Sequence, residues 1–582
     1  MFCTPFQQIA SMHQPALRSV SVALAGSGGA GVMTAGNVLL EAAAIAGYYG
    51  LMTRTSGPQI RGGEAAAMLR VATFPTDGQD DGFQVLAAID WQNVTRFAAE
   101  IPLGPSSLIL GDPAAGAPPE LFLKTGARYA PVPLKALAAQ VAGGWPNMIA
   151  LGVLAGVMGL SIESLDAAVR KSLKKNVDAG LGAAHLGFSQ AAAIGGFQLE
   201  PPPPRGERWL VSGNEAAGYG ALRGGVRFVA AYPITPATEL LEYLSPALTK
   251  IGGTLVQAED ELASINMALG ASYGGVPSLT ATSGPGLSLM IESLGLGVAA
   301  EVPVVVVDVM RTGPSTGIAT KSEQGDLNIA LYGLHGDAPH IVVAPNSVGD
   351  CLSATQWAVE LAESLQVPAI VLSDQYFGQA RAIVDALHAE TSTVERLRAS
   401  APEGDGAAPY KRYAITPSGV SPMAIPGRPG ITYTADGLEH NERGLPSSQA
   451  ADHLAQMDKR ARKISQLDPG DAWASIEGQG DVALLTFGSC TAPAREALAR
   501  AHAEGVDVRL VSLRLLAPAQ PERLKRALEG VKRVIVLEQN HSGQFLRHLR
   551  SEYDLPREVK SLRRPGPLPF RPEEIYKEII QP

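Results

Sequence analysis

Several apolar runs in the middle of the chain end in residues whose types could do chemistry. Thr235 lies in the motif Tyr-Pro-Ile-Thr-Pro, in which two prolines fix the backbone in front of a helical pattern. Glu261 begins the helical stretch ELASINMALG. Ser283 and Gly284 open Ser-Gly-Pro-Gly, and Arg311 directly follows the run VPVVVVDVM. Because ligands of parallel sheets bind beyond the carboxyl ends of the strands, we expect these residues at one edge of one sheet.

Each of these positions also has an ordinary structural explanation. Thr235 fits the N-cap of the following helix, with Pro236 at the first helical position. A glutamate in a first helical turn, such as Glu261, is usually solvated and complements the helix dipole. Arg311 fits a pair with a structural carboxylate, although a charge directly after a valine-rich run is harder to explain in this way. The case for a binding site therefore rests on their convergence at one edge.

The elements that position these residues follow from hydrophobic patterning. Short apolar runs alternate with helical segments, which predicts an α/β fold of several doubly wound domains with parallel sheets covered by helices. In the middle region we expect strands within 226–231, 254–259, 277–283, 302–310, 340–345 and 368–374. Towards the C-terminus we expect strands within 481–488, 506–513, 532–539 and 558–562.

Two shifts in composition divide the chain. Consecutive prolines at 201–204 cannot continue a helix or a central strand and favour a stiff spacer. From about 391 to 480 the sequence is rich in proline, glycine and charge, with one helix expected around 447–467. The expected segments are a loose tail at 1–18, an N-terminal domain at 19–195, a linker at 196–208, a central domain at 209–390, a connecting segment at 391–478 and a C-terminal domain at 479–582.

Composition excludes several classes of function. The chain has 582 residues, 46% of them apolar, and a net charge of −9 with acids dispersed among bases. No basic stripe is present to neutralise a nucleic-acid backbone, and no apolar run reaches the ~18–20 residues that cross a bilayer. Three cysteines, Cys3, Cys351 and Cys490, cannot build a disulfide framework or a four-thiolate iron–sulfur site. We expect a cytoplasmic protein that binds neither nucleic acid nor membrane, with any redox cluster on another chain.

The glycines at 26, 28 and 31 satisfy the dinucleotide-binding pattern Gly-x-Gly-x-x-Gly, between a strand-like run and a helical stretch. That fingerprint also needs an acidic residue about 20 positions further on to hold the ribose hydroxyls. The stretch YYGLMTRTSGPQIRGG occupies that place, with no acid before Glu64. We therefore expect no NAD. A non-catalytic NAD-binding module is the rival interpretation, and nucleotide-induced thermal stabilisation would distinguish it.

Five blocks of sequence, in this order, resemble one protein family. They are GNEAAGYGAL, YPITPATEL, QAEDELASINMALGASYGG, TSGPGLSLM and RTGPSTGIATKSEQGDL. Together they closely resemble the alpha subunit of the 2-oxoacid:ferredoxin oxidoreductases, and the resemblance covers the whole chain. Residues 19–195 of this chain resemble the gamma domain of that family. Residues 209–390 resemble its pyrimidine-type domain of thiamine enzymes, and residues 479–582 resemble its transketolase C-terminal-like domain. The fused arrangement and GLEHNERG at 437–444 are most similar to the 2-oxoglutarate enzymes.

The resemblance implies an enzyme that uses thiamine diphosphate to decarboxylate a 2-oxoacid oxidatively, passes electrons singly to ferredoxin and forms acyl-coenzyme A. It identifies Glu261 as the glutamate that binds N1′ of the aminopyrimidine and favours the imino tautomer. Arg311 matches the arginine for the substrate carboxylate, to which a guanidinium offers two donors. Thr235 matches a threonine that touches substrate or cofactor near the reacting carbons. Further cofactor contacts are expected at Tyr232, Pro233, Ile234, Ser283 and Gly284.

Half of the cofactor site is missing from the sequence. The resemblance implies a Gly-Asp-Gly motif, followed by an asparagine, that holds the diphosphate through Mg²⁺. The Gly-Asp-Gly at 404–406 lies in the connecting segment without a strand or helix around it, and Asn441 lies in another loop, so we interpret this match as a coincidence. We expect a beta subunit to carry the Mg²⁺, the diphosphate site and a [4Fe-4S] cluster, in an (αβ)₂ heterotetramer.

Contacts to the rest of the substrate are less specific. The loop at 53–63 resembles the gamma-domain segment that closes over the substrate, with Ser56, Gly57 and Arg61 as contacts, and an ordinary exposed turn is the alternative. A second substrate carboxylate would need another cation, from Lys321, Arg61 or a partner residue.

The sequence allows alternatives for the role of one C-terminal segment, for the 2-oxoacid and for the class of enzyme. Residues 537–545, LEQNHSGQF, follow a strand and could contact coenzyme A or the partner. Pyruvate or a branched-chain 2-oxoacid is the alternative substrate to 2-oxoglutarate. A non-redox thiamine dehydrogenase component is the alternative enzyme, although it would lack the gamma domain and the proline-flanked threonine.

Overall fold

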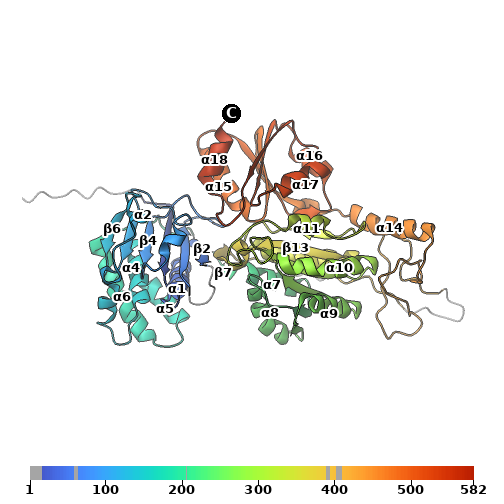
Figure 1. Ribbon diagram of the computed structural model, residues 1–582, viewed down its shortest axis with the longest axis horizontal. Coiled ribbons are helices and arrows are strands. Elements are labelled where there is room, and N and C mark those ends of the chain that lie inside the picture. Colours follow the sequence, from blue (N-terminus) through green and yellow to red (C-terminus); the bar gives the residue numbers. More distant parts are fainter. Residues whose placement is uncertain (1–15, 58–62, 205, 388–393, 401–408, 582) are drawn as a thin grey trace, which may run out of the picture. The chain divides into compact units, whose positions relative to one another are not determined.

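The structure is a computed structural model that describes residues 16–57, 63–204, 206–387, 394–400 and 409–581. The chain divides into two compact units, residues 1–210 and 211–582, which are described separately (Figure 1). Of the expected N-terminal tail, residues 1–15 lie outside the described part. Strand β7 (Arg208–Ser212) crosses the boundary between the units.

The first unit contains a mixed sheet with the strand order β6-β5-β4-β1-β3-β2. The pairs β1–β4, β4–β5 and β5–β6 are parallel, whereas β3 is antiparallel to both β1 and β2. The strands are β1 (Ser19–Gly26), β2 (Tyr49–Ser56), β3 (Ala65–Ala72), β4 (Val85–Ala88), β5 (Leu108–Gly111) and β6 (Arg128–Pro131). The helices are α1 (Val32–Ile45), α2 (Glu120–Leu123), α3 (Leu134–Ala138), α4 (Pro146–Val157), α5 (Ile162–Ser172) and α6 (Val177–Ile194), with short 3₁₀ turns η1 (Val94–Phe97) and η2 (Pro113–Ala115).

The glycine-rich segment forms the tight turn from β1 to α1 that its sequence predicts. Gly31 has a φ of 81°, a left-handed conformation that favours glycine. A side chain there would also collide with Asn147, because a Cβ would lie 2.3 Å from its Nδ2. Asp90 accepts hydrogen bonds from the Ser27 backbone N–H at 3.1 Å and from its hydroxyl at 2.6 Å. Helix packing and turn geometry therefore account for these residues.

The second unit begins with a sheet of order β18-β12-β13-β11-β10-β8-β9. All neighbours from β12 to β9 pair in parallel, and β18 is antiparallel to β12. The strands are β8 (Phe228–Ala231), β9 (Thr254–Gln257), β10 (Ser278–Thr282), β11 (Val304–Met310), β12 (Ile341–Val343), β13 (Pro368–Asp374) and β18 (Leu515–Ala517). Strand β14 (Arg381–Asp385) comes after β13 in the chain and does not belong to this sheet. The apolar runs of the middle region thus form the predicted strands.

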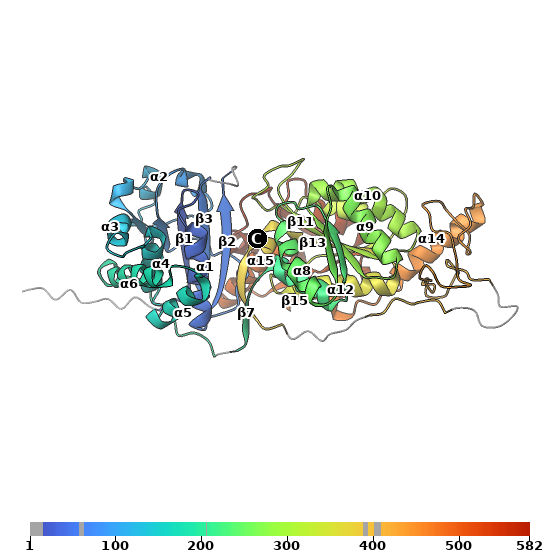
Figure 2. The same cartoon turned by 90° about the horizontal axis from the view of Figure 1, so that it is seen from below.

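Helices cover this sheet, and two of them begin at the edge where the carboxyl ends of its strands lie. They are α7 (Gly213–Arg223), α8 (Thr238–Lys250), α9 (Glu261–Tyr273), α10 (Gly284–Ala299), α11 (Leu327–Tyr332), α12 (Asp350–Leu365) and α13 (Gln375–Gln379). Helices α9 and α10 lie side by side in both views (Figure 1, Figure 2) and contact each other. Each begins directly beyond a strand, α9 after β9 and α10 after β10, so their N-termini lie at the carboxyl edge of the sheet.

A further sheet near the C-terminus has the order β15-β17-β16-β19-β20, parallel except for β15. Its strands are β15 (Ala474–Gly478), β16 (Val482–Phe487), β17 (Val508–Leu513), β19 (Arg533–Glu538) and β20 (Glu558–Arg563). Its helices are α15 (Thr491–Ala503), α16 (Pro521–Ala527), α17 (Gln544–Glu552) and α18 (Pro572–Ile580), and η3 (Gly470–Trp473) and η4 (Gly488–Cys490) are 3₁₀ turns. Figure 1 shows α17 next to α11, and the two helices are in contact.

The connecting segment contains the expected helix, α14 (Ala450–Ser465). Within the described ranges, no helix combines the length and apolar character that a membrane crossing requires.

Candidate active site

The proline-flanked motif forms the turn between β8 and α8. Tyr232 is exposed and Thr235 is partly buried. Helix α8 begins at Thr238 with Ala237 at its N-cap and no side-chain cap. The interpretation of Thr235 as the N-cap is therefore wrong, because the helix starts two residues beyond Pro236. The carbonyl of Thr235 instead accepts a hydrogen bond from Arg311 Nη1 at 2.7 Å.

Glu261 is the first residue of α9, and it is buried rather than solvated. Asp260 caps the helix, because its side chain accepts a hydrogen bond from the Ala263 N–H at 2.7 Å. Glu261 is only 7% exposed. Its carboxylate has no hydrogen-bond or ion-pair partner among the residues that the structure describes. A buried ionisable group without a partner is typical of a binding or catalytic site.

Glycines make room for this carboxylate beside the N-terminus of α10. A Cβ at position 286 would lie 2.6 Å from Glu261 Oε1 and 2.0 Å from Thr282 Oγ1, so only glycine fits there. A Cβ at position 284 would lie 2.5 Å from Oδ1 of Asp326. Gly284 and Gly286 thus let two carboxylates approach one helix N-terminus from different elements.

Arg311 follows β11 and is 7% exposed. Its Nη1 donates to the Thr235 carbonyl, while its buried Nε has no partner within the described part of the chain. Burial lowers the pKa of Arg311, and the negative charge of Asp326 acts in the opposite sense. A guanidinium with unused donors at a sheet edge can bind a carboxylate.

Two carboxyl groups that sequence reasoning did not single out lie next to Arg311. Asp308 is a fully buried residue of β11, and Asp326 precedes α11 without capping it. Burial and the neighbouring carboxyl group of Asp326 raise the pKa of Asp308 well above its usual range. Burial and the charge of Glu323 raise the pKa of Asp326 to about 7, against the lowering effects of Arg311 and of a hydrogen bond from Asp308.

The sequence carried a signal for one of these two residues. Asp308 interrupts a run of valines in a central strand, where an ionised carboxylate would have no water. Asp326 carries no comparable signal, because an aspartate before a short helix is ordinary.

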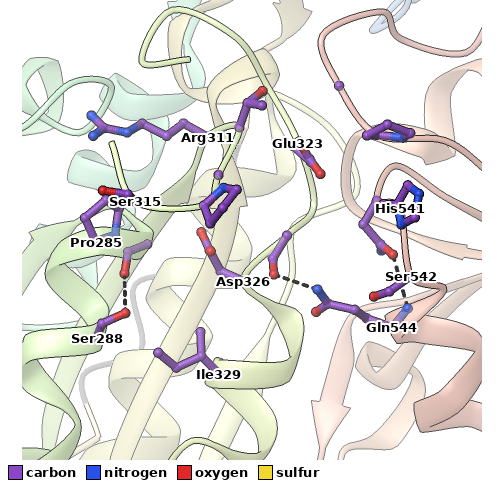
Figure 3. A pocket seen from close by; sticks show the side chains of 18 residues that line it. Pro285, Ser288, Arg311, Ser315, Glu323, Asp326, Ile329, His541, Ser542 and Gln544 are labelled. Carbon is purple, nitrogen blue, oxygen red and sulfur yellow. Dashed lines mark hydrogen bonds between the residues drawn. The ribbon is translucent and has the colours of Figure 1, made fainter. Parts of the chain in front are cut away.

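Arg311, Asp326 and Gly284 line a cavity of about 780 Å³ that the C-terminal region completes. In Figure 3, Arg311, Pro285 and Ser288 lie on one side, His541, Ser542 and Gln544 lie on the other, and Asp326 lies between them. Gln544 joins the two sides, because its Nε2 donates to the Gly325 carbonyl at 2.8 Å and its Oε1 accepts from the Asn328 N–H at 2.8 Å. The segment LEQNHSGQF, expected at a ligand, thus reaches the same cavity as Arg311.

The other site residues predicted from the sequence differ in burial and in their contacts. Ser283 is fully buried with an unpartnered hydroxyl within the described residues, next to Gly284 of the cavity lining. Pro233 and Ile234 are partly buried in the turn after β8. Lys321 accepts a hydrogen bond at its carbonyl from the Thr312 N–H.

In the first unit, 53–56 belong to β2 rather than to a loop, and Ser56 is its last residue. The Gly57 N–H donates to the Glu64 carbonyl at 3.1 Å. Arg61 lies outside the described residues.

No metal-binding group is formed by the part of the chain that the structure describes. Among these residues, no cluster of three or more His, Cys, Asp or Glu side chains could hold a metal ion. Asn441 Oδ1 accepts from the backbone N–H groups of Arg443 and Leu445, as in an ordinary turn. The Gly-Asp-Gly at 404–406 lies outside the described residues.

Three segments of the chain match known protein families. Residues 219–459 match the family described as pyruvate flavodoxin/ferredoxin oxidoreductase, thiamine diP-bdg. Residues 21–190 match pyruvate ferredoxin/flavodoxin oxidoreductase, and 480–575 match pyruvate:ferredoxin oxidoreductase core domain II. The fold and the site thus define a multidomain α/β oxidoreductase subunit with a thiamine diphosphate-binding domain.

Full-length relatives narrow this class. The chain is 30% identical to the 2-oxoacid:ferredoxin oxidoreductase 2 subunit alpha of Aeropyrum pernix, over 91% of this chain and 93% of that one. It is 35% identical to the 2-oxoglutarate oxidoreductase subunit KorA of Mycobacterium tuberculosis, over 74% and 67%. A solved 2-oxoglutarate:ferredoxin oxidoreductase from Magnetococcus marinus, with 2-oxoglutarate, coenzyme A and succinyl-CoA bound, superimposes with a TM-score of 0.88 at 35% identity, over 97% and 100%. The chain belongs to the alpha-subunit family of the 2-oxoacid:ferredoxin oxidoreductases.

Proposed function

We propose that this chain is the alpha subunit of a 2-oxoglutarate:ferredoxin oxidoreductase. The enzyme would convert 2-oxoglutarate and coenzyme A to succinyl-CoA and CO₂, with electrons passing singly to ferredoxin. The observation that carries the proposal is the buried, unpartnered carboxylate of Glu261 at the same sheet edge as Arg311. The choice of 2-oxoglutarate is supported by the names of the relatives from M. tuberculosis and M. marinus.

The residues at this edge fit the aminopyrimidine side of thiamine diphosphate. When bound, the cofactor supplies the carbon nucleophile and the electron sink that decarboxylation needs. Glu261 would hold a proton at N1′, since no partner in the described chain competes for its carboxylate. Ser283 and Gly284, beyond β10, and residues 232–234, beyond β8, would line the ring at adjacent strand ends.

Arg311 and Thr235 would orient the substrate. One N–H of the Arg311 guanidinium holds the Thr235 carbonyl at 2.7 Å, so the turn and the arginine are fixed to each other. The remaining donors would bind the carboxylate next to the keto carbon. The distal carboxylate of 2-oxoglutarate would need a second cation, and Lys321, Arg61 or a residue of the partner are the candidates.

The remaining half of the site would come from a beta subunit with Mg²⁺ and a [4Fe-4S] cluster, in an (αβ)₂ assembly. Helices α9 and α10 support such a partner, because three of their apolar side chains are exposed by about half: Leu262 and Met267 on α9, and Leu289 on α10. Exposed apolar side chains on the helices that carry an incomplete site are typical of an interface.

Rates of ferredoxin reduction by the purified complex test the proposal. The complex with its beta subunit should prefer 2-oxoglutarate over pyruvate and a branched-chain 2-oxoacid, and should need coenzyme A. The isolated chain should be inactive and bind thiamine diphosphate poorly, because it lacks the diphosphate half. Preference for pyruvate would contradict the substrate assignment, and coenzyme-A-dependent activity of the isolated chain would contradict the shared site.

A further inference from the structure

Asp308 and Asp326 form a carboxyl pair whose hydrogen bonding requires a proton. Both oxygens of Asp308 and Oδ2 of Asp326 are buried and, if both groups are ionised, unpartnered within the described residues. Two ionised carboxylates cannot donate to each other and repel. A single proton shared between them supplies the missing hydrogen bond, in line with the proximity of the two groups. We therefore describe the pair as monoprotonated near neutral pH.

The pair has one buried member and one member that faces the cavity. Asp308 lies inside β11 and touches no solvent. Asp326 lines the cavity together with Arg311 and with His541 of the C-terminal region, as Figure 3 shows. Asp326 does not cap α11, and its carboxyl group lies against Gly284 at the start of α10. The carboxyl group of Asp326 is thus available to a ligand in the cavity.

We propose that Asp326 accepts the proton that leaves the thiol of coenzyme A, and that Asp308 is a positioning residue that holds Asp326 for this task. The inference rests on the proposed function, because Arg311 would place the substrate carboxylate, and hence the acyl carbon, at the same cavity. In this step the S–H bond of coenzyme A would break and a bond would form between sulfur and the acyl carbon. The bond that holds the acyl carbon on thiamine diphosphate would break, and its electron pair would return to the cofactor. The proton moves to a carboxylate oxygen of Asp326, and two electrons leave for ferredoxin as in the overall reaction.

The charges around Asp326 suit a proton acceptor for a thiol. An alkyl thiol ionises near pH ~8.5, and a base is most effective when its own pKa is near the working pH. The pKa of Asp326, about 7, meets this condition. Glu323, itself near His541, raises this pKa, whereas Arg311 and a hydrogen bond from Asp308 lower it. Changing Glu323 or Asp308 should therefore change the pH dependence of kcat/KM for coenzyme A in a different way.

The test uses the complex with its beta subunit and measures kcat/KM for coenzyme A against pH. Asp326→Asn should lower this constant by ~10²-fold or more, the usual scale for losing a positioned proton acceptor. Its loss in the coenzyme-A-independent, 2-oxoglutarate-dependent reduction of a dye should be much smaller. Asp337→Asn, at an exposed aspartate of the same region, is the matched control and should leave both rates unchanged.

Neighbouring variants should move the acidic limb of the profile in opposite directions. Glu323→Gln removes a negative charge, which lowers the pKa of Asp326 and shifts the limb to lower pH. Asp308→Leu removes the hydrogen-bond donor to ionised Asp326 and shifts the limb to higher pH. Asp308→Asn keeps an N–H donor and should leave the limb near that of the wild type. A merely structural role would not produce opposite shifts with rescue by asparagine.

Three outcomes would overturn the inference. A limb that stays fixed, or that moves in the same direction in Glu323→Gln and Asp308→Leu, would contradict the role of Asp326. So would equal losses in the two reactions of Asp326→Asn. If the wild-type complex oxidises no 2-oxoacid, the proposed function fails and the inference fails with it. If Asp326→Asn does not assemble, the three neighbouring variants still decide.

Discussion

Two groups of buried charged side chains in the second unit differ in how they are paired. In the first group Glu301 is fully buried, and each of its carboxylate oxygens accepts from a lysine, Oε1 from Lys459 at 2.5 Å and Oε2 from Lys463 at 3.1 Å. Arg412 donates to the Glu301 carbonyl at 2.8 Å, and Ser421 accepts from Lys459 at 3.0 Å. These side chains join α14 and the connecting segment to the end of α10.

At the strand edge, by contrast, buried groups keep atoms unused. Within the described residues the carboxylate of Glu261, the Nε of Arg311 and the hydroxyl of Ser283 have no partner. Burial without pairing costs stability, so its retention indicates a ligand or a second subunit. The pairing of a buried charge, more than its burial, therefore separates a structural cluster from a functional one.

Glu301→Gln should give the largest effect, because it leaves two buried lysines without their counter-charge. Removing one partner of a buried ion pair costs about 3–5 kcal/mol. We expect a correspondingly lower midpoint of urea unfolding, with turnover per folded molecule unchanged. Glu292→Gln, at an exposed glutamate of α10, is the control and should leave the midpoint in place. An unchanged midpoint in Glu301→Gln would mean that the cluster is not structural.

The same cluster predicts a loss of stability in acid. Lys463 and Lys459 hold the pKa of Glu301 at about 2, against 4.5 for a free glutamate and in spite of the burial that raises it. A carboxylate with a lowered pKa stabilises the fold above the unfolded value, and this contribution is lost as the pH falls from 4.5 towards 2. At 1.36 kcal/mol per unit this amounts to about 3 kcal/mol. The stability difference between wild type and Glu301→Gln should therefore shrink across this range, whereas a constant difference would contradict the assignment.

Glu261→Gln should affect turnover rather than stability. Glutamine keeps the shape of the side chain but changes the hydrogen bond at N1′, so we expect turnover to fall by ~10²-fold or more. The assembled complex and its thiamine content should survive. Glu259→Gln, at an exposed glutamate two residues away, is the control. Near-wild-type turnover of Glu261→Gln would mean that Glu261 is only a helix-end residue.

The sequence predicted the strand edge, but neither the cluster of Glu301 with its lysines nor the pair of Asp308 and Asp326. Apolar runs predicted the strands, and local order then placed Glu261, Ser283 and Arg311 beyond them, because each follows its strand directly. Lys459 and Lys463 lie in a helix of many charged residues, where lysines usually face solvent. Their burial depends on Glu301, which lies about 160 positions away in sequence. No local pattern reveals such a partner.

Asp326 was hidden for the same reason. Its environment is set by Asp308 in another element and by Gly284 at the start of α10. Sequence spacing gave Thr235 two interpretations, and only the position of α8 decided against the N-cap. Contacts over long sequence separations are therefore what the structure adds.

Arg311→Lys should give the smallest effect and divides substrate binding from cofactor activation. Lysine keeps the positive charge, but it replaces a rigid fork with a single ammonium group. The wild-type guanidinium already uses one N–H on the Thr235 carbonyl, so the lysine would have to choose between that carbonyl and the substrate. Losing one charge-assisted hydrogen bond costs roughly 1.5–3 kcal/mol, or about a 10- to 150-fold loss in kcat/KM. Arg550→Lys, at an exposed arginine of α17, is the control.

The pattern of this loss across substrates identifies the carboxylate that Arg311 binds. If it binds the carboxylate that leaves as CO₂, every 2-oxoacid should suffer similarly, because that group is common to all. If it binds the distal carboxylate of 2-oxoglutarate, pyruvate should be spared. Deprotonation of the cofactor at C2, measured by proton–deuterium exchange on the assembled complex, should be nearly unchanged in both cases, because Glu261 is intact. Much slower exchange with an unchanged substrate Kd would show that Arg311 belongs to cofactor activation, and the unpartnered donors at this edge would then serve the cofactor instead of the substrate.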